Sequence, residues 1–157
     1  MKIKLLFIGR LQADVFHEAL MQYIKKINYY FSFEQVVLPY LKSSKSLSQD
    51  EQKKLEGEQI LKKISANDYI VLLDEKGKQF SSIEFSSFVQ QQVNVSCKNI
   101  VFIIGGAYGF SREVYQRKNQ TISLSKMTFP HIMARLIFAE QLYRACTILN
   151  NEPYHHE

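Results

Sequence analysis

Cysteine is scarce in this sequence, with only Cys97 and Cys146 among 157 residues. Neither residue has the CxxC or Cys/His spacing of a metal site, and two distant cysteines do not make a disulfide framework. Cys146 falls within a helical apolar pattern, which is typical of a small core residue. The sequence therefore predicts a protein without a bound metal.

Long apolar runs are also missing, because nowhere does the chain approach the run of about 18 apolar residues that a membrane helix needs. The N-terminal MKIKLLFIGR superficially resembles a short signal sequence. Its apolar run covers only residues 5–8 and no small-residue cleavage site follows, so it is better interpreted as a first strand. We expect a soluble, cytoplasmic protein with no membrane contact.

The balance of charges is modest, with 20 Lys and Arg against 15 Asp and Glu spread along the chain. An isoelectric point of about 9.1 favours an acidic partner such as nucleic acid, although many basic proteins bind none. The length fits one domain, residues 1–157, with a core of its own.

Short apolar runs alternate with segments of helical periodicity along the whole chain. The runs predict strands at residues 3–8, 33–38, 69–73, 100–104 and 121–124, with residues 74–77 turning out of the third. The periodic segments predict helices over residues 14–27, from Ser48 to Ile64, from Ser81 to Val93, after Ser111, and from Thr128 to Leu149. This order predicts an α/β domain with a mostly parallel sheet flanked by helices.

Several details of these helices are specific. Thr128 is the expected cap of the last helix, and Asn150 suits a left-handed residue at its end. Gly57 lies inside a predicted helix, either because another segment packs closely there or by chance. The Ser- and Lys-rich loop at residues 42–48 is assigned no role.

Two strand ends open into loops rich in glycine and hydroxyl groups, where α/β proteins usually bind a ligand. The first loop has the pattern GGxxG, not the dinucleotide fingerprint GxGxxG, and residues 120–135 contain no acid to hold a ribose. Ser125-Lys126 in the second loop lacks the glycine of a phosphate-binding loop. Both a nicotinamide cofactor and NTP hydrolysis are therefore disfavoured.

The last helix carries polar groups on an otherwise apolar surface. Glu140 and Arg144 form an i,i+4 pair, whose default interpretation is a solvated salt bridge. His131 and Arg135 are placed on the opposite side, among Met133, Leu136, Phe138 and Leu142. A helix that is apolar nearly all round needs a second burying surface, and a homodimer interface is the simplest candidate.

The tail after the last helix reads EPYHHE and carries two of the four histidines. It is either a frayed terminus or, as Pro153 and Tyr154 directly after a helix suggest, an ordered segment. Tyr and His side chains can stack on or hydrogen-bond a nucleobase, and His can move a proton near neutral pH.

Taken in order and at their spacing, the segments VFIIGGAYGFS, ISLSKMTFPHIMAR, EQLYRA and EPYH resemble the RlmH family. This is a family of small bacterial methyltransferases in the SPOUT, or trefoil-knot, superfamily. The resemblance extends over the whole chain. It implies a SPOUT fold with a C-terminal trefoil knot in residues 100–150, and a homodimer.

The resemblance also implies a reaction and a site. S-adenosylmethionine would be the methyl donor, and the substrate would be N3 of a pseudouridine in 23S rRNA of the assembled 70S ribosome. The resemblance places Arg144, Tyr154 and His155 at the methyl-accepting side, with one protomer's tail completing its partner's site. It places the donor at Leu73, Gly105, Leu124, Ser125, Lys126, Met127, Thr128 and Phe129.

Elementary chemistry agrees with this assignment. A sulfonium donor with no phosphates needs close backbone approach rather than an anion cradle, and its methyl group needs no metal. What remains is alignment and removal of the N3 proton, for which we expect His155 or Tyr154 to assist and Arg144 to steady the negative charge. Two alternatives stay open: a non-catalytic RNA- or ribosome-binding SPOUT module, and a SPOUT methyltransferase acting on tRNA.

Overall fold

A five-stranded parallel sheet organises the chain, with strand order β2-β1-β4-β3-β5. The computed structural model describes residues 1–11, 15–42 and 46–156. The strands are β1 (Lys2–Ile8), β2 (Ser32–Leu38), β3 (Tyr69–Gln79), β4 (Asn99–Ile104) and β5 (Gln120–Ser123). The helices are α1 (Val15–Ile27), α2 (Gln49–Leu61), α3 (Ser82–Asn94), α4 (Arg112–Arg117) and α5 (His131–Leu149). The predicted α/β class and parallel sheet are confirmed.

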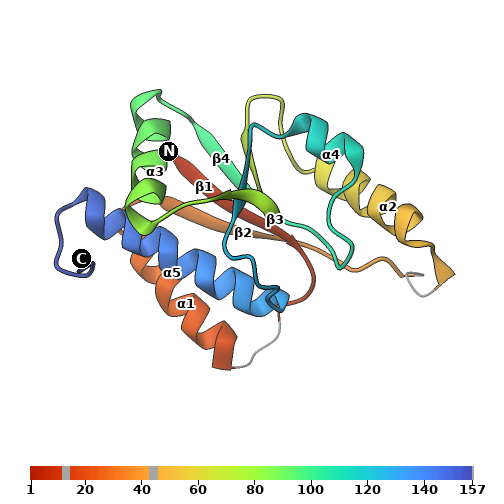
Figure 1. Cartoon of the computed structure of the whole chain (residues 1–157), viewed down its shortest axis with the longest axis horizontal. Coiled ribbons are helices and arrows are strands. Elements are labelled where there is room, and N and C mark those ends of the chain that lie inside the picture. Colours follow the sequence, from red (N-terminus) through yellow and green to blue (C-terminus); the bar gives the residue numbers. More distant parts are fainter. Residues whose placement is uncertain (12–14, 43–45, 157) are drawn as a thin grey trace.

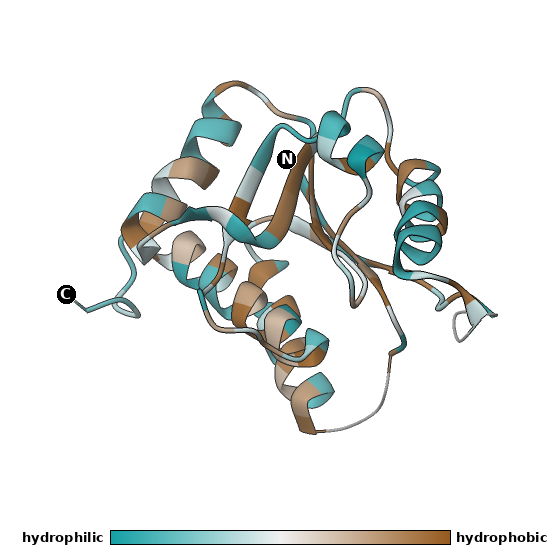
Figure 2. Cartoon of the chain, turned by 45° about the vertical axis from the view of Figure 1, so that its right-hand side comes forward, coloured by the Kyte–Doolittle hydropathy of each residue, from teal (hydrophilic) through white to brown (hydrophobic). Residues whose placement is uncertain are grey.

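Helices cover both faces of this sheet (Figure 1). Helices α1, α3 and α5 pack on one face, against alternate strand residues such as Phe7 and Phe102. Helices α2 and α4 pack on the other face, against residues such as Leu72 and Ile103. Because both faces are buried, the central strands have continuous apolar runs at residues 5–8, 70–73 and 100–104, and brown strand segments lie between the helices in Figure 2.

The predicted caps of α2, α3 and α4 are confirmed. Both capping boxes form: the Ser48 and Ser81 hydroxyls accept from the backbone N–H three residues on, and the glutamates reach back. Ser111 caps α4 by accepting from the Val114 N–H. Helix α2 ends at Leu61, three residues before the predicted end.

Residues 74–77 leave the ladder with β5, as the predicted turn implies, but the predicted end of the strand there is wrong. The strand continues to Gln79, and its register against β5 shifts because Leu73 and Lys78 both pair with Ile122. Gly77 lies so close to β5 that an added Cβ would be 2.6 Å from the Ile122 carbonyl carbon. The sequence DEKG resembles a turn, but here its glycine allows two backbones to approach.

Two predictions about the ends of α5 are also wrong. Pro130, not Thr128, is the N-cap, and it makes no side-chain capping bond. At the other end Asn150 keeps φ at −104°, because its backbone and side-chain N–H groups both donate to the Cys146 carbonyl. The left-handed residue is the next one, Asn151, with φ 55°.

Helix α5 lies between α1 and α3, so part of its second burying surface comes from its own chain (Figure 1). Arg135, Phe138 and Leu142 are buried as expected, whereas Met133 and Leu136 are half-exposed. At 100° per residue these two fall on the side of Glu140, so their predicted position was wrong. The homodimer and the trefoil knot stay predictions.

Some predictions concern residues outside those described. Asp14, the expected start of the first helix, is one, and residues 43–45 of the Ser- and Lys-rich loop are others. Within residues 1–11, 15–42 and 46–156, none of the helices has the length and apolar character needed to cross a membrane.

Candidate active site

A cavity of about 560 Å³ lies beside β3 and the loops that follow β4 and β5. Its walls come from the loop after β4, the loop after β5, residues 73–76 of β3 and the start of α5. Seven of the eight residues predicted to hold the donor line it. They are Leu73, Gly105, Leu124, Ser125, Met127, Thr128 and Phe129. The eighth, Lys126, is exposed and is not among the lining residues.

The glycine loop after β4 is a tight reversal. Gly106 and Gly109 form an isolated antiparallel bridge, and the Gly109 N–H donates to the Gly106 carbonyl at 3.1 Å. Gly109 has a φ of +80°, a left-handed conformation in which a side chain is strained. The three glycines of this loop line the cavity without side chains, together with Ala107, Tyr108 and Phe110.

Behind this loop lies a buried carboxylate that sequence reasoning missed. Glu56 of α2 is 2% exposed, and its Oε1 accepts from the Gln52 side chain at 2.9 Å. A Cβ added to Gly106 would be only 2.0 Å from Glu56 Oε2. Burial raises the pKa of Glu56, while the Gln52 hydrogen bond and nearby His131 lower it in part.

Close packing also explains the glycine in α2. A Cβ on Gly57 would be 2.4 Å from the Ser111 hydroxyl, so α2 and the cap of α4 touch at this point. Of the two interpretations of Gly57, close packing is confirmed. The contact holds α2, and with it Glu56, against the glycine loop.

The second loop is shaped by its own hydroxyl groups. The Ser123 hydroxyl donates to the Ser125 carbonyl at 2.9 Å, and the Ser125 hydroxyl accepts from the Met127 N–H at 2.9 Å. The side chain of Ser125 therefore stabilises the conformation of the loop. The remaining backbone groups of the loop are the ones that can reach a ligand.

Acidic and phenolic groups complete the rim of the cavity. Asp74 and Glu75 both line it, and the Tyr115 hydroxyl donates to Asp74 Oδ2 at 2.5 Å. Burial raises the pKa of Tyr115, and the hydrogen bond to Asp74 adds to the shift. No sequence signal distinguished Asp74 and Glu75, because residues 74–77 resemble a turn.

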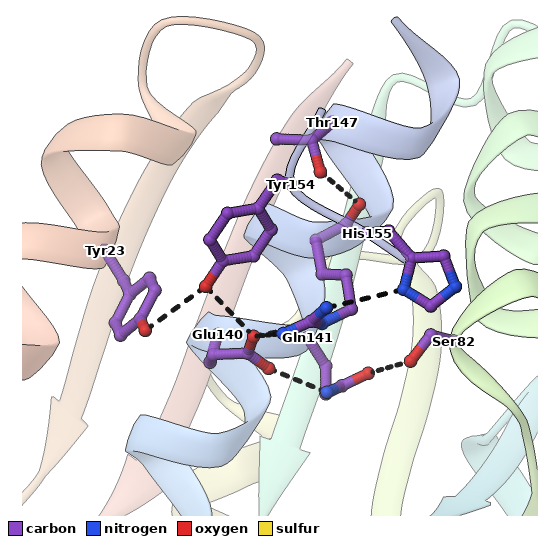
Figure 3. Close-up of polar contacts among 8 residues, drawn as sticks. Tyr23, Ser82, Glu140, Gln141, Thr147, Tyr154 and His155 are labelled. Carbon is purple, nitrogen blue, oxygen red and sulfur yellow. Dashed lines mark hydrogen bonds and ion pairs between the residues drawn. The ribbon is translucent and has the colours of Figure 1, made fainter. Parts of the chain in front are cut away.

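A second polar cluster lies at the far end of α5, where the predicted catalytic residues meet (Figure 3). Glu140 Oε1 accepts from Arg144 Nη2 at 2.6 Å and from Arg144 Nε at 3.0 Å. Arg144 Nη1 lies 3.4 Å from Nδ1 of His155. A guanidinium can only donate, so this ring nitrogen accepts. The Glu140–Arg144 pair is thus half-buried within a network rather than a solvated bridge.

Tyr154 joins the same cluster through its ring and its hydroxyl. Its ring centroid is 4.8 Å from that of Tyr143, and the Arg144 guanidinium lies 4.7 Å from the Tyr154 centroid. Its hydroxyl donates to Glu140 at 3.2 Å and contacts the Tyr23 hydroxyl at 3.5 Å. Burial and these hydrogen bonds raise the pKa of Tyr154, so its phenol stays protonated at neutral pH.

The tail that carries these groups is ordered. Glu152 accepts from the Tyr30 hydroxyl at 2.6 Å, and its backbone N–H donates to the Thr147 carbonyl at 2.9 Å. Of the two interpretations of the tail, the ordered one is confirmed for residues up to His156.

The two clusters are separated along α5. His131 and Ala134 line the cavity, whereas Arg144 lies ten residues beyond Ala134. At 1.5 Å per residue this is roughly 15 Å along the helix axis. Tyr154 and His155 are not among the residues that line the cavity of their own chain. Among the residues described, no three His, Cys, Asp or Glu side chains gather into a group that could hold a metal.

A parallel α/β domain with a cavity formed by these two loops is the arrangement of a SPOUT methyltransferase. The chain belongs to that family: the family model described as "Predicted SPOUT methyltransferase" matches residues 1–155. It is therefore a methyltransferase, and S-adenosylmethionine is its methyl donor.

The relatives point to one kind of methyltransferase within this family. The chain is 53% identical to the ribosomal RNA large subunit methyltransferase H of Parabacteroides distasonis and 52% identical to that of Bacteroides thetaiotaomicron, each over the full length of both chains. These identities confirm the resemblance to the RlmH family. A probable methylase family protein from Haemophilus influenzae shares the fold at TM-score 0.53 and 13% identity, covering 99% of this chain and 70% of that one.

Proposed function

We propose that this chain methylates N3 of a pseudouridine in large-subunit rRNA within the assembled 70S ribosome, as a homodimer in the cytoplasm. The observation that carries the proposal is the pairing of a cavity at the predicted donor residues with a separate cluster of Arg144 on α5 and Tyr154 and His155 on the tail. Relatives 53% and 52% identical are named as methyltransferases of large-subunit rRNA, which supports the choice of substrate.

The cavity fits S-adenosylmethionine in size and chemistry. Its volume of about 560 Å³ is that of a small-molecule site. Gly105 and Gly106 carry no side chain at the cavity, so their backbone donors and acceptors can approach an adenosine closely. Asp74 and Glu75 on the rim suit a donor that carries a positive charge. When bound, the donor supplies an activated methyl group, and Leu73, Gly105 and the loop at residues 124–129 would hold it.

The outward side of α5 supports a dimer. Ile132, Met133, Leu136 and Ile137 are half-exposed on this side, on the helix that begins at the donor cavity. Glu140 and Arg144 continue the same side toward the tail. A second copy packed antiparallel against it would bury these side chains and bring its Arg144 cluster to the first copy's cavity. The roughly 15 Å between the two clusters in one chain would then be bridged by the partner.

The tail residues supply the proton chemistry. In the free chain, Nδ1 of His155 accepts a weak hydrogen bond of 3.4 Å from Arg144. When a uracil ring enters, Arg144 can turn to donate to a carbonyl oxygen of the base, and the freed Nδ1 can accept the N3 proton. Arg144 then steadies the negative charge on the base during transfer. Tyr154, protonated and stacked, positions Arg144 rather than acting as the base.

Two measurements test this function. Ribosomes from a strain lacking the gene should accept one methyl group per large subunit from the purified protein, and mass mapping should locate it on N3 of a pseudouridine. Methylation of tRNA instead, or no calorimetric binding of S-adenosylmethionine, would contradict the proposal. In single-turnover assays, His155→Ala should slow methylation strongly and Tyr154→Phe moderately. Wild-type rates in both would remove the tail from the proton chemistry.

A further inference from the structure

A second cavity, of about 290 Å³, lies at the carboxyl end of β1 beside the donor cavity. The two cavities share His131 as a lining residue. The remaining walls come from the end of β1, the segment after β2 and the first turns of α5: Ile8, Gly9, Arg10, Tyr40, Ile132 and Arg135. The donor residues predicted from the sequence all lie outside this second cavity.

Two arginines, Arg10 and Arg135, line the second cavity, and none of the described lining residues is acidic. Arg135 is 6% exposed, and its guanidinium carbon lies 4.3 Å from the centroid of the Phe7 ring. Its Nη1 lies 3.5 Å from the Arg10 carbonyl oxygen. These contacts fix the guanidinium of Arg135 in the wall of the second cavity.

Arg10 differs from Arg135 because its side chain is exposed. Its guanidinium carbon lies 5.9 Å from the centroid of the Tyr40 ring, which is 51% exposed. A planar guanidinium beside an exposed aromatic ring can donate to an oxyanion while a ribose or base lies against the ring. The pair therefore forms an entrance suited to a nucleotide.

The N-terminal end of α5 adds positive electrostatic potential at the second cavity. His131 and Ile132, the first two residues of this 19-residue helix, line the cavity. Pro130 at the N-cap contributes no side-chain acceptor. The positive end of the helix dipole, with its free N–H groups, is therefore available near the two arginines.

We infer that this second cavity binds a backbone phosphate of the RNA substrate, next to the nucleotide that is methylated. The inference rests on the proposed function, because it takes RNA as the substrate. RNA carries a phosphate at every nucleotide, so a target base at the donor cavity brings neighbouring phosphates to the adjoining one. The carboxylate of the methyl donor shares the anionic chemistry, but the cavity opens toward solvent at Arg10, where a polymer can enter.

The test compares Arg10→Gln with Arg112→Gln, which makes the same charge change at an exposed position of α4 that lines neither cavity. Binding to ribosomes from the deletion strain is measured by co-sedimentation over a series of KCl concentrations. Loss of one phosphate contact should reduce the slope of log K against log salt by about 0.7 to 0.9. We expect this for Arg10→Gln, a wild-type slope for Arg112→Gln, and a largely preserved slope for Arg10→Lys.

Calorimetry with S-adenosylmethionine separates the two sources of an anion. Unchanged donor affinity in Arg10→Gln supports the phosphate, whereas weakened donor affinity with an unchanged salt slope would assign the cavity to the donor's carboxylate and overturn the inference. Equal slopes for Arg10→Gln and Arg112→Gln would also overturn it. Failure of the proposed function would show differently, as wild-type protein that does not methylate these ribosomes.

Discussion

Replacing Gly106 with alanine should weaken donor binding through a collision that the structure locates. The new methyl group would lie 2.0 Å from Glu56 Oε2. Helix α2 cannot easily retreat, because Gly57 holds it against Ser111 and retreat would break that contact. The glycine loop must therefore move toward the cavity, or the buried Glu56 carboxylate must leave its position. Overpacking of this kind typically costs about 1 to 3 kcal/mol.

If that cost falls on the loop shape that the donor needs, affinity for S-adenosylmethionine should fall by about 5-fold to 150-fold. Calorimetry measures the change directly, and thermal unfolding shows whether the variant remains folded. Glu56→Ala removes the colliding atoms, so Glu56→Ala/Gly106→Ala should bind the donor better than Gly106→Ala alone. The single Glu56→Ala variant supplies the baseline for this comparison.

A result within twofold of wild type for Gly106→Ala would refute the reasoning, since the loop would then tolerate displacement without affecting the donor. Equal affinities for Gly106→Ala and the double variant would refute it more narrowly. In that case the loss would come from the loop itself and not from the contact with Glu56.

Three further predictions follow from burial and hydrogen bonding. Because burial raises the folded-state pKa of Glu56 above 4.5, its contribution to stability is greatest below pH 4.5 and declines as pH rises through the raised value. Glu56→Gln should flatten this decline in urea midpoints, and an unaltered pH profile would contradict the assignment. Burial raises the pKa of the Cys146 thiol to about 12, so iodoacetamide at mildly alkaline pH should leave it unmodified until denaturant is added, whereas half-exposed Cys97 should react faster. Tyr30→Phe removes the 2.6 Å hydrogen bond to Glu152 and should make the tail more sensitive to carboxypeptidase while lowering kcat; a tail as resistant as wild type would show that this contact does not hold it.

The elements could be predicted where a local signal determines the structure. Apolar runs defined the strands, and Ser48 with Glu51 fixed a helix start because both capping partners lie within four residues. Local sequence signals did not predict the structure where contact with a segment distant in the sequence determines it. Gly77 lies within β3, and a Cβ added there would be 2.6 Å from the carbonyl carbon of Ile122 in β5. No local pattern reveals that neighbour.

The same division holds for the site. The loops after β4 and β5 were predictable because they follow buried strands and carry glycine and hydroxyl groups. Glu56 was not, since it lies about fifty residues before the loop that it supports and resembles an ordinary helix surface residue. Glu140 was interpreted as a solvated partner of Arg144, because only the folded tail shows that Tyr154 also binds it.

The central claim is that one chain supplies the donor cavity and its partner supplies the tail. Complementation between two defective variants tests it: Gly106→Ala impairs the cavity, and His155→Ala impairs the tail. Each alone should lose at least about fivefold in activity toward ribosomes from the deletion strain at limiting S-adenosylmethionine. After dissociation and mixing in equal amounts, sites formed from two intact halves should restore about a quarter of wild-type activity if chains pair at random. Activity no greater than the mean of the two separate variants would contradict a site shared between subunits.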